Sequence, residues 1–328
     1  MFNKTEKEIM KNWVGDINNP LVSIKCITYN HELYICDALE SFLMQETTFP
    51  FEVIVHDDAS TDNTANIIRE YEKKYSNIIK PIYETENQYS KHDGSLSKKI
   101  NSKIKGKYIA FCEGDDYWTN CNKLEKQVSF LDNNKDYIGV GHMARSIDRN
   151  GNNVKTFIDS KPGEYTIKDN SNWQLFAHVS SWLFRYSFID IINESYSDFY
   201  KLQLPGDRII PLLLLNKGRL FVLSDCYSIY RYQSSENSYT SKIENSIIAK
   251  IYQEYETLEN YAVSNNINVN YSIPKRRALV VAFTKLIKLK DYNSFFIILN
   301  KRKKYLTDII YCIYTEFIIM LRKIGKHE

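Results

Sequence analysis

The fold of this 328-residue chain is decided by residues 106–118, which read GKYIAFCEGDDYW. The run Tyr108–Cys112 is apolar and rich in residues that favour β-strands, and it ends at the acidic cluster Glu113-Gly114-Asp115-Asp116. A short apolar run bounded by a polar turn predicts a buried strand with carboxylates at its carboxyl end.

Similar runs occur on both sides of this stretch. The predicted strands are Val22–Ile27, Phe51–Val55, Ile78–Tyr83, Tyr108–Cys112 and Tyr137–Val140, and helical patterns lie between them. Ser60 or Thr61 can cap the helix that follows the second strand. Alternation of this kind predicts an α/β fold, with a mostly parallel sheet covered by helices on both faces. Ligands of such sheets bind outside the carboxyl ends of the strands.

The second half of the chain is less regular. It predicts a strand at Ser180–Arg185, a helix at Pro205–Lys217, short strands at Leu220–Leu223 and Tyr227–Tyr232, and helices from Ser241 onward.

Composition and charge narrow the class of protein. Hydrophobic residues make up 43% of the chain and charged residues 25%, which is typical of a globular protein and excludes a mostly disordered one. The net charge of +3 indicates no nucleic-acid partner. The sequence contains no run of 18 apolar residues, so it predicts no transmembrane helix, and the start, MFNKTEKEIMKNW, does not resemble a secretory signal. The six cysteines show no metal-ligand spacing, so we expect reduced thiols in a cytoplasmic protein.

Two acidic clusters follow predicted strands and could carry chemistry. Carboxylates bunched at a strand end repel one another unless a divalent cation lies among them, and oxygen ligands suit Mg²⁺ or Mn²⁺. The alternative for residues 113–116 is a solvated turn. Helix capping explains Ser60–Asp62, but it leaves Asp57 and Asp58 unexplained. A carboxylate there could accept hydrogen bonds from a nucleobase or from ribose hydroxyls.

Three segments together resemble an inverting family 2 glycosyltransferase with the GT-A fold, the Rossmann-like fold of nucleotide-diphospho-sugar transferases. They are VSIKCITYN at 22–30, VHDDASTDNT at 55–64 and the stretch at 106–118, in the family's order and spacing. The third segment resembles a bacterial subgroup that assembles surface polysaccharides such as capsule and lipopolysaccharide. The resemblance is strong over residues 20–145, fair over 175–240 and absent after about 245.

The resemblance implies a role for each polar residue at the donor side. Thr28, Tyr29 and Asn30 would line the nucleotide pocket, and Asp57 and Asp58 would hold the base or ribose. Glu113 and Asp115 take the two acid places of the DXD motif, although a strict motif has Asp where Glu113 stands. Asp115 and Asp116 would bind Mn²⁺ or Mg²⁺ on the donor diphosphate, and Arg231 would neutralise phosphate charge. The family often has Gly in place of Tyr89 and His in place of Gln233.

The resemblance also implies a base and acceptor contacts. Asp207, at the start of a predicted helix, would be the general base; the alternative is an N-cap Asp with no catalytic role. The acceptor candidates are Trp118, His178, Ser181 and Trp182, although a Trp on a strand is more often a core residue.

The C-terminal segment 301–324 is basic at both ends and apolar along Tyr305–Leu321. It could pack on the domain or lie peripherally on the inner face of the plasma membrane. The predicted organisation is a lead-in at 1–20, a nucleotide-sugar-binding half at 21–145, an acceptor-binding half at 146–240 and a helical region at 241–328.

The resulting prediction is a metal-dependent inverting glycosyltransferase. It would move a sugar from a nucleoside-diphosphate donor, UDP by default, to a glycan or lipid-linked glycan hydroxyl. The alternative is a catalytically silent nucleotide- or glycan-binding subunit on the same fold. A nucleotidyltransferase would release pyrophosphate instead of a nucleoside diphosphate. No G-x-G-x-x-G follows the first strand, which disfavours a dinucleotide-dependent oxidoreductase.

Overall fold

The computed structural model describes residues 3–154, 160–170, 176–194, 202, 204, 206–232, 247–275 and 314. The chain forms two compact units, Met1–Asn170 with Gln174–Ser234, and Ser171–Trp173 with Ser235–Glu328. Every predicted site residue belongs to the first unit. The segment 301–324 lies outside the described residues except for Tyr314, so its predicted packing or membrane contact stays a prediction.

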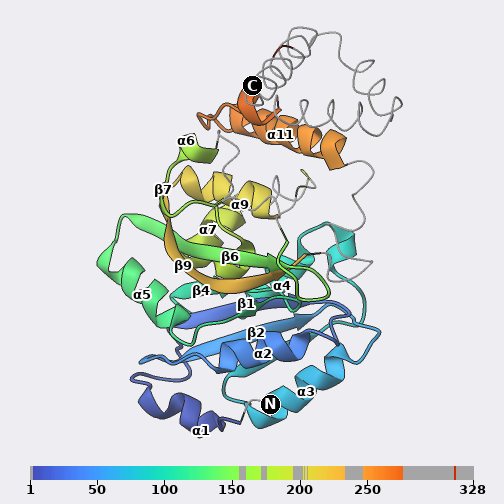
Figure 1. Ribbon diagram of the computed structural model, residues 1–328, viewed down its shortest axis with the longest axis vertical. Coiled ribbons are helices and arrows are strands. Elements are labelled where there is room, and N and C mark those ends of the chain that lie inside the picture. The colour runs from blue at the N-terminus through green and yellow to red at the C-terminus, as the bar shows by residue number, and fades with distance from the viewer. Residues whose placement is uncertain are drawn as a thin grey trace, which may run out of the picture. The chain divides into compact units, whose positions relative to one another are not determined.

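Nine strands of the described residues form one sheet in the first unit, flanked by helices (Figure 1). Their order is β3-β2-β1-β4-β8-β6-β9-β5, and β7 pairs with β9. The strands are β1 (Val22–Thr28), β2 (Phe51–Asp57), β3 (Ile79–Tyr83), β4 (Tyr108–Phe111), β5 (Tyr117–Trp118), β6 (Tyr137–Ile147), β7 (Gly163–Tyr165), β8 (Leu183–Arg185) and β9 (Arg219–Arg231).

The helices alternate with the strands in the first half of the chain. They are α1 (Glu6–Ile9), η1 (Met10–Asn12), α2 (Ile35–Leu43), α3 (Thr64–Lys74), η2 (Tyr89–Lys91), α4 (Ser95–Asn101), α5 (Lys123–Asn133), α6 (Ile167–Asn170), η3 (Val179–Ser181), α7 (Ser187–Glu194), α9 (Gly206–Leu215) and α11 (Ile247–Ser264), where η marks a 3₁₀ helix. The predicted α/β class is confirmed by this alternation.

The sheet is mixed. β3, β2, β1 and β4 run parallel, β8 is antiparallel to both β4 and β6, and β6 is parallel to β9. Ile24, Val53 and Ala110, in three of the parallel strands, are completely buried. Burial on both faces explains why these strands are near-continuous apolar runs in the sequence. The consequence for the site is that four strands end at the same edge of the sheet.

The structure corrects four details of the predicted elements. Helix α3 begins after Asn63 and not at Ser60 or Thr61, because the Ser60 hydroxyl accepts a hydrogen bond from the Asn30 N–H instead. The predicted strand at 180–185 is η3 followed by β8. The two short strands predicted at 220–223 and 227–232 are one strand, β9, whose polar middle lies at a bulge opposite His142 and Met143. The short strands β5 and β7 were not predicted.

The second unit contains α11, whose buried side chains include Tyr255, Leu258 and Tyr261. Across the described ranges, each helix is too short or too polar to span a bilayer. Five of the six cysteines fall in these ranges, and all five are free thiols, as predicted. Cys312 lies outside the described residues.

Candidate active site

The three segments that the sequence singled out meet at the carboxyl edge of the parallel strands. Thr28 at the end of β1 is in register with Asp57 at the end of β2, and Asp57 is in register with Tyr83 of β3. The acidic loop after β4 continues along β1, since the Gly114 N–H donates to the Ile27 carbonyl at 2.9 Å. Polar residues from separate parts of the chain therefore gather where α/β sheets bind ligands.

Gly114 lets the acidic loop approach the first strand closely. A Cβ atom at this position would lie 2.7 Å from both Cβ and Oγ1 of Thr28 and 3.0 Å from Nδ1 of His31. These separations are too short for a non-bonded contact, so the loop can take this path only with glycine in the middle of Glu113-Gly114-Asp115.

The segment Thr28-Tyr29-Asn30 is tied to the turn after β2. Asn30 adopts a left-handed conformation with φ of 55°, and its side-chain oxygen accepts the Thr61 N–H at 2.8 Å. Its own N–H donates to the Ser60 hydroxyl at 2.9 Å. Tyr29 is 41% exposed, and among the described residues the buried Thr28 hydroxyl has no hydrogen-bond partner. The predicted nucleotide-pocket residues thus form a rigid turn with polar groups left for a ligand.

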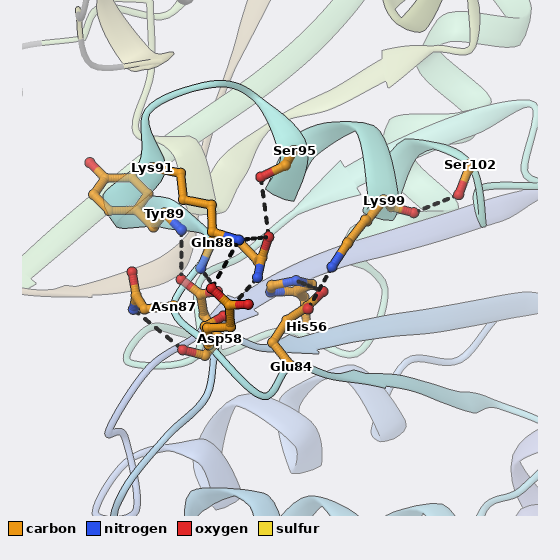
Figure 2. Close-up of polar contacts among 11 residues, drawn as sticks. His56, Asp58, Glu84, Asn87, Gln88, Tyr89, Lys91, Ser95, Lys99 and Ser102 are labelled. Atoms are coloured by element: carbon orange, nitrogen blue, oxygen red, sulfur yellow. Dashed lines mark hydrogen bonds and ion pairs between the residues drawn. The ribbon is translucent and has the colours of Figure 1, made fainter.

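Asp57 and Asp58 differ in their surroundings. Both carboxylate oxygens of Asp58 accept main-chain hydrogen bonds, from Gln88 at 2.6 Å and from Tyr89 at 2.9 Å (Figure 2). Burial raises the pKa of Asp57, and hydrogen bonds with Ser60 partly counteract this effect. In the described part of the chain, Oδ1 of Asp57 has no hydrogen-bond partner. Asp57 therefore has an oxygen left for a donor group of a nucleoside, whereas Asp58 already holds the chain.

The acidic loop brings three carboxyl groups together. Desolvation and the charges of Asp115 and Asp207 raise the pKa of Glu113 to about 8. The Glu113 side chain is exposed to solvent, and the carboxylates of Asp115 and Asp207 act on it across the loop. Asp116 is 1% exposed, and desolvation and the charge of Asp115 raise its pKa well above the ordinary value. Such a cluster is stabilised by a bound cation.

Arg231 and two histidines surround this cluster. The Arg231 main-chain N–H donates to Asp116 Oδ1 at 2.9 Å, and its guanidinium donates to the Asp115 carbonyl at 2.7 Å and to the Asp37 carboxylate. His178 Nδ1 lies 3.7 Å from Asp116 Oδ2, and His31 Nε2 lies 3.9 Å from Asp115 Oδ2. Desolvation lowers the pKa of His178 to about 4, so this imidazole is neutral at pH 7. Arg231 is the cation that offsets the acids, and its predicted contact with phosphate stays a prediction.

Asp207 is the second residue of α9 and lies within electrostatic reach of the acidic loop. Its carboxylate raises the pKa of both Glu113 and Tyr89. The chain separation between Glu113 and Asp207 is large, so only the tertiary structure brings the predicted base close to the predicted metal motif. Its assignment as the base stays a prediction.

Three of the four acceptor candidates are core residues, which corrects that interpretation. Trp118 and Trp182 are each 1% exposed, and their indole N–H groups donate to the carbonyls of Ser180 at 2.6 Å and Ala177 at 2.9 Å. Ser181 is fully buried, and its hydroxyl donates to the His178 carbonyl at 2.7 Å. Both indoles satisfy their polar group inside the protein, so neither ring face is available to a sugar. His178 remains a candidate because it borders the acidic loop.

The carboxylate oxygens of the loop are suitable ligands for Mg²⁺ or Mn²⁺. Asp116 Oδ2 is buried without a hydrogen-bond partner among the described residues, and Asp115 contributes a second carboxylate. In the same ranges, His, Cys, Asp and Glu side chains form no group of three that could hold a metal by themselves. Mg²⁺ is commonly bound by one or two carboxylates together with substrate phosphates, so the two carboxylates of the loop are the residues that would hold it.

The sequence interpretation missed three residues of the site. His31 directly follows Asn30, and the polar run Thr28–His31 was a signal for it. Asp37, in the first turn of α2, pairs with Arg231, and no local pattern indicates this pair. Tyr89 was noted only as a departure from the family.

The family model described as Glycosyl transferase family 2 matches residues 23–191, just over half of the chain. The chain belongs to glycosyl transferase family 2. This family 2 chain is 35% identical to an uncharacterized protein of Mycobacterium tuberculosis over 216 residues, which are 64% of this chain and 58% of that one. It is 37% identical over 122 residues to Bacillus subtilis TuaG, whose name describes it as a teichuronic acid biosynthesis glycosyltransferase. That match covers 37% of this chain and 44% of TuaG.

Solved structures agree with the family at the level of the fold. The S. aureus TarS fragment 1–349 in complex with UDP-GlcNAc superposes with a TM-score of 0.57 at 22% identity, covering 89% of this chain and 79% of that fragment. The expected GT-A fold is confirmed by this likeness. The matched region spans only about half the length of the curated relatives, 58% and 44% of the two named above, so their activities bear on this chain only as proposals.

Proposed function

We propose that the chain is a metal-dependent inverting glycosyltransferase of surface-polysaccharide assembly. The observation that carries the proposal is that the polar carboxyl edge of β1 and β2, the acidic loop and Asp207 of α9 come together. Family membership, the teichuronic acid name of TuaG and the UDP-GlcNAc complex of TarS support it. We take a UDP-sugar as the donor and a glycan or lipid-linked glycan as the acceptor.

Each group has a role in the proposed reaction. Thr28, Tyr29, Asn30 and Asp57 hold the nucleoside, and Asp115 and Asp116 hold Mn²⁺ or Mg²⁺. The bound ion supplies charge that stabilises the leaving diphosphate. Arg231 reduces the negative charge of the acidic loop, and His178 faces the same loop as a neutral group.

Asp207 performs the proton transfer in this mechanism. The acceptor hydroxyl oxygen forms a bond to the anomeric carbon while the bond from that carbon to the diphosphate oxygen breaks. The bonding electrons leave with the nucleoside diphosphate, and the hydroxyl proton moves to the Asp207 carboxylate. A single in-line displacement of this kind inverts the anomeric configuration.

Binding and product analysis test the proposal. The wild-type chain is titrated with UDP, GDP and dTDP and their sugars, each with Mn²⁺ and with EDTA, and transfer to short glycans and lipid-linked glycans is followed by mass spectrometry. Asp207→Asn is expected to lower kcat by about 10²–10⁴-fold and to leave donor binding unchanged, since only the base is removed. Asp190→Asn, an exposed first-turn Asp of α7, is the control and should keep full activity.

The outcomes separate the candidate functions. Release of nucleoside diphosphate with an inverted product supports the proposal, and release of pyrophosphate would identify a nucleotidyltransferase. Nucleotide binding without turnover would favour the silent binding subunit. A fully active Asp207→Asn variant would contradict the assignment of the base.

A further inference from the structure

The side chain of Arg231 is fixed by groups from three other parts of the chain. Arg231 ends β9, and its side chain is only 12% exposed. Its guanidinium contacts Asp37 in α2, the Asp115 carbonyl in the acidic loop, and two tyrosine rings. A guanidinium is planar and carries its donors in a fixed fork, so several simultaneous contacts determine its orientation. We call Arg231, Asp37, Tyr34 and Tyr117 the arginine clamp.

The edge of the guanidinium connects α2 with the acidic loop. One terminal nitrogen, Nη2, donates to the Asp37 carboxylate, and the other, Nη1, donates to the Asp115 carbonyl at 2.7 Å. Asp37 lies in the first turn of α2, and its side chain is 54% exposed. A hydrogen bond between ionised groups is roughly twice as strong as one between neutral groups. The bond to Asp37 therefore helps to orient the guanidinium toward the acidic loop.

Two aromatic rings hold the same guanidinium. Its Cζ atom lies 4.9 Å from the centroid of the Tyr34 ring, at the N-cap of α2, and 4.5 Å from that of the Tyr117 ring in β5. Tyr117 pairs with Ile229 of β9, so it is a diagonal neighbour of Arg231 on one face of the two strands. Arginine cations are attracted to aromatic faces at such separations. The rings therefore restrict the guanidinium to its place beside the acidic loop.

The two residues that Arg231 holds are the proposed ligands of the cation. Its guanidinium holds the main chain of Asp115, and its own N–H donates to Asp116 Oδ1 at 2.9 Å. Arg231 is in register with Ile147 of β6, so the sheet determines where that N–H lies. Because Oδ1 is engaged, Oδ2 is the oxygen of Asp116 that remains for a cation, and it has no hydrogen-bond partner within the described part of the chain. One arginine thus sets the positions of both ligands.

We propose that Asp37 is a positioning residue of the cation site. It holds the guanidinium of Arg231, and Arg231 in turn holds Asp115 and Asp116 in the arrangement that binds the cation. Groups that orient metal ligands without touching the metal commonly change metal affinity by about 10–100-fold when they are replaced. This inference rests on the proposed function, since it places the cation at these two carboxylates.

Charge alone predicts the opposite effect for Arg231. A guanidinium near the ligands repels a bound cation, so a neutral replacement would strengthen cation binding if only charge mattered. Lysine keeps the charge but lacks the planar fork that joins the Asp37 carboxylate to the Asp115 carbonyl. The positioning role therefore predicts weaker cation binding in both Arg231→Gln and Arg231→Lys.

Nucleotide binding with and without metal tests the proposal and requires no turnover. The Kd of UDP, GDP and dTDP for the full chain is measured in EDTA and at one fixed Mn²⁺ concentration, and the ratio of the two values is the metal-dependent gain. The variants are Asp37→Asn, Arg231→Lys, Arg231→Gln and the double variant Asp37→Asn/Arg231→Lys. Electron paramagnetic resonance of the bound Mn²⁺ reports its ligand geometry, and thermal unfolding confirms that each variant is folded.

Arg219, at the start of β9, provides a matched control. Its guanidinium donates to Asp136 at 2.9 Å and to Glu164 at 2.7 Å, and its Cζ atom lies 4.8 Å from the centroid of the Tyr137 ring. These groups resemble the arginine clamp in composition but lie at the opposite end of the strand from Arg231. Asp136→Asn should therefore leave both Kd values unchanged.

The expected result is a loss of the metal-dependent gain only. Asp37→Asn and both Arg231 variants should lower the gain about tenfold or more, while the Kd in EDTA stays within about twofold of the wild-type value. The double variant should bind no more weakly than Arg231→Lys alone, because Asp37 acts only through the guanidinium. The resonance of bound Mn²⁺ should change in the same variants and not in Asp136→Asn.

Three outcomes would overturn the inference while leaving the proposed function intact. They are an unchanged or larger gain in Arg231→Gln, an effect of Asp37→Asn that persists in full beside Arg231→Lys, and an equal rise of the Kd with and without Mn²⁺ in the Arg231 variants. The last result would indicate that Arg231 contacts the nucleotide directly. A wild-type chain whose nucleotide binding does not depend on Mn²⁺ would refute the metal dependence in the proposed function, and the inference with it.

Discussion

The carboxylate of Asp58 offers a quantitative test of how the site is held together. It is buried and accepts two main-chain hydrogen bonds, from Gln88 and Tyr89. Hydrogen bonds to charged groups contribute about 1.5–3 kcal/mol each, so losing both could cost about 3–6 kcal/mol. The hydrogen bond from the Tyr89 N–H is only partly buried, so water can replace part of it. We therefore expect Asp58→Ala to lower the free energy of unfolding by about 3 kcal/mol.

Asp58→Asn provides the intermediate point of the series. The amide keeps one acceptor oxygen, so one of the two N–H groups stays bonded, and we expect about half of the loss seen with Ala. Asp93→Ala is the matched control. Asp93 accepts the Ser95 N–H at 2.9 Å in the same segment, but it is exposed to solvent, so little change is expected.

Urea unfolding followed by circular dichroism measures these differences, with the m-value checked for constancy. The segment could also open locally before the protein unfolds, and this would limit the global loss. Trypsin therefore serves as a second assay, since Lys91, Lys98 and Lys99 lie in the segment, and cleavage there should be faster in Asp58→Ala. Unchanged stability together with unchanged cleavage would refute the view that Asp58 holds this segment.

Two further predictions concern other parts of the first unit. Gly114→Ala should cost about 1–3 kcal/mol of stability through overpacking against Thr28 and should weaken metal-dependent nucleotide binding; an unchanged melting temperature and Kd would contradict the close approach. Lys123 is fully buried over the Trp118 ring, and desolvation lowers the pKa of its ammonium group to about 7. Between pH 7 and about 10.5 the unfolded chain therefore binds more protons than the folded chain, so the free energy of unfolding should rise with pH. Lys123→Met should remove that rise and stabilise the protein at pH 7 by about 3 kcal/mol, allowing for the lost cation–π contact; urea unfolding at pH 7 and pH 10 that shows no difference between the two chains would rule this out.

The parallel half of the sheet was predictable because its strands are buried on both faces. Burial of that kind produces continuous apolar runs, and the polar residues that end each run mark the carboxyl edge. The other half was less predictable. β9 is half-exposed and carries a polar bulge, so its apolar pattern is interrupted, and β5 and β7 have only two and three residues.

The candidate site shows the same division between local and long-range information. Gly114 and the acids beside it are adjacent in the chain, and their chemistry can be recognised there. The burial of Trp118 and Trp182 cannot be recognised in the same way, since an aromatic residue in or next to a short strand faces a ligand or the core according to what packs against it. The pairing of Arg231 with Asp37 joins residues 194 positions apart, and no periodicity predicts it.

The sequence by itself was sufficient to establish the α/β class, the acidic loop and the family, because these depend on residue types at short spacing along the chain. Tertiary structure decided which carboxylates are free to act. The two oxygens of Asp58 hold the 88–89 main chain, while one oxygen of Asp57 and one of Asp116 are unpaired among the described residues. The fold also brings Asp207 into electrostatic range of Glu113. The physical reason is that hydrogen bonds, desolvation and charge interactions act over a few ångströms in space, and distance along the chain does not determine which groups are that close.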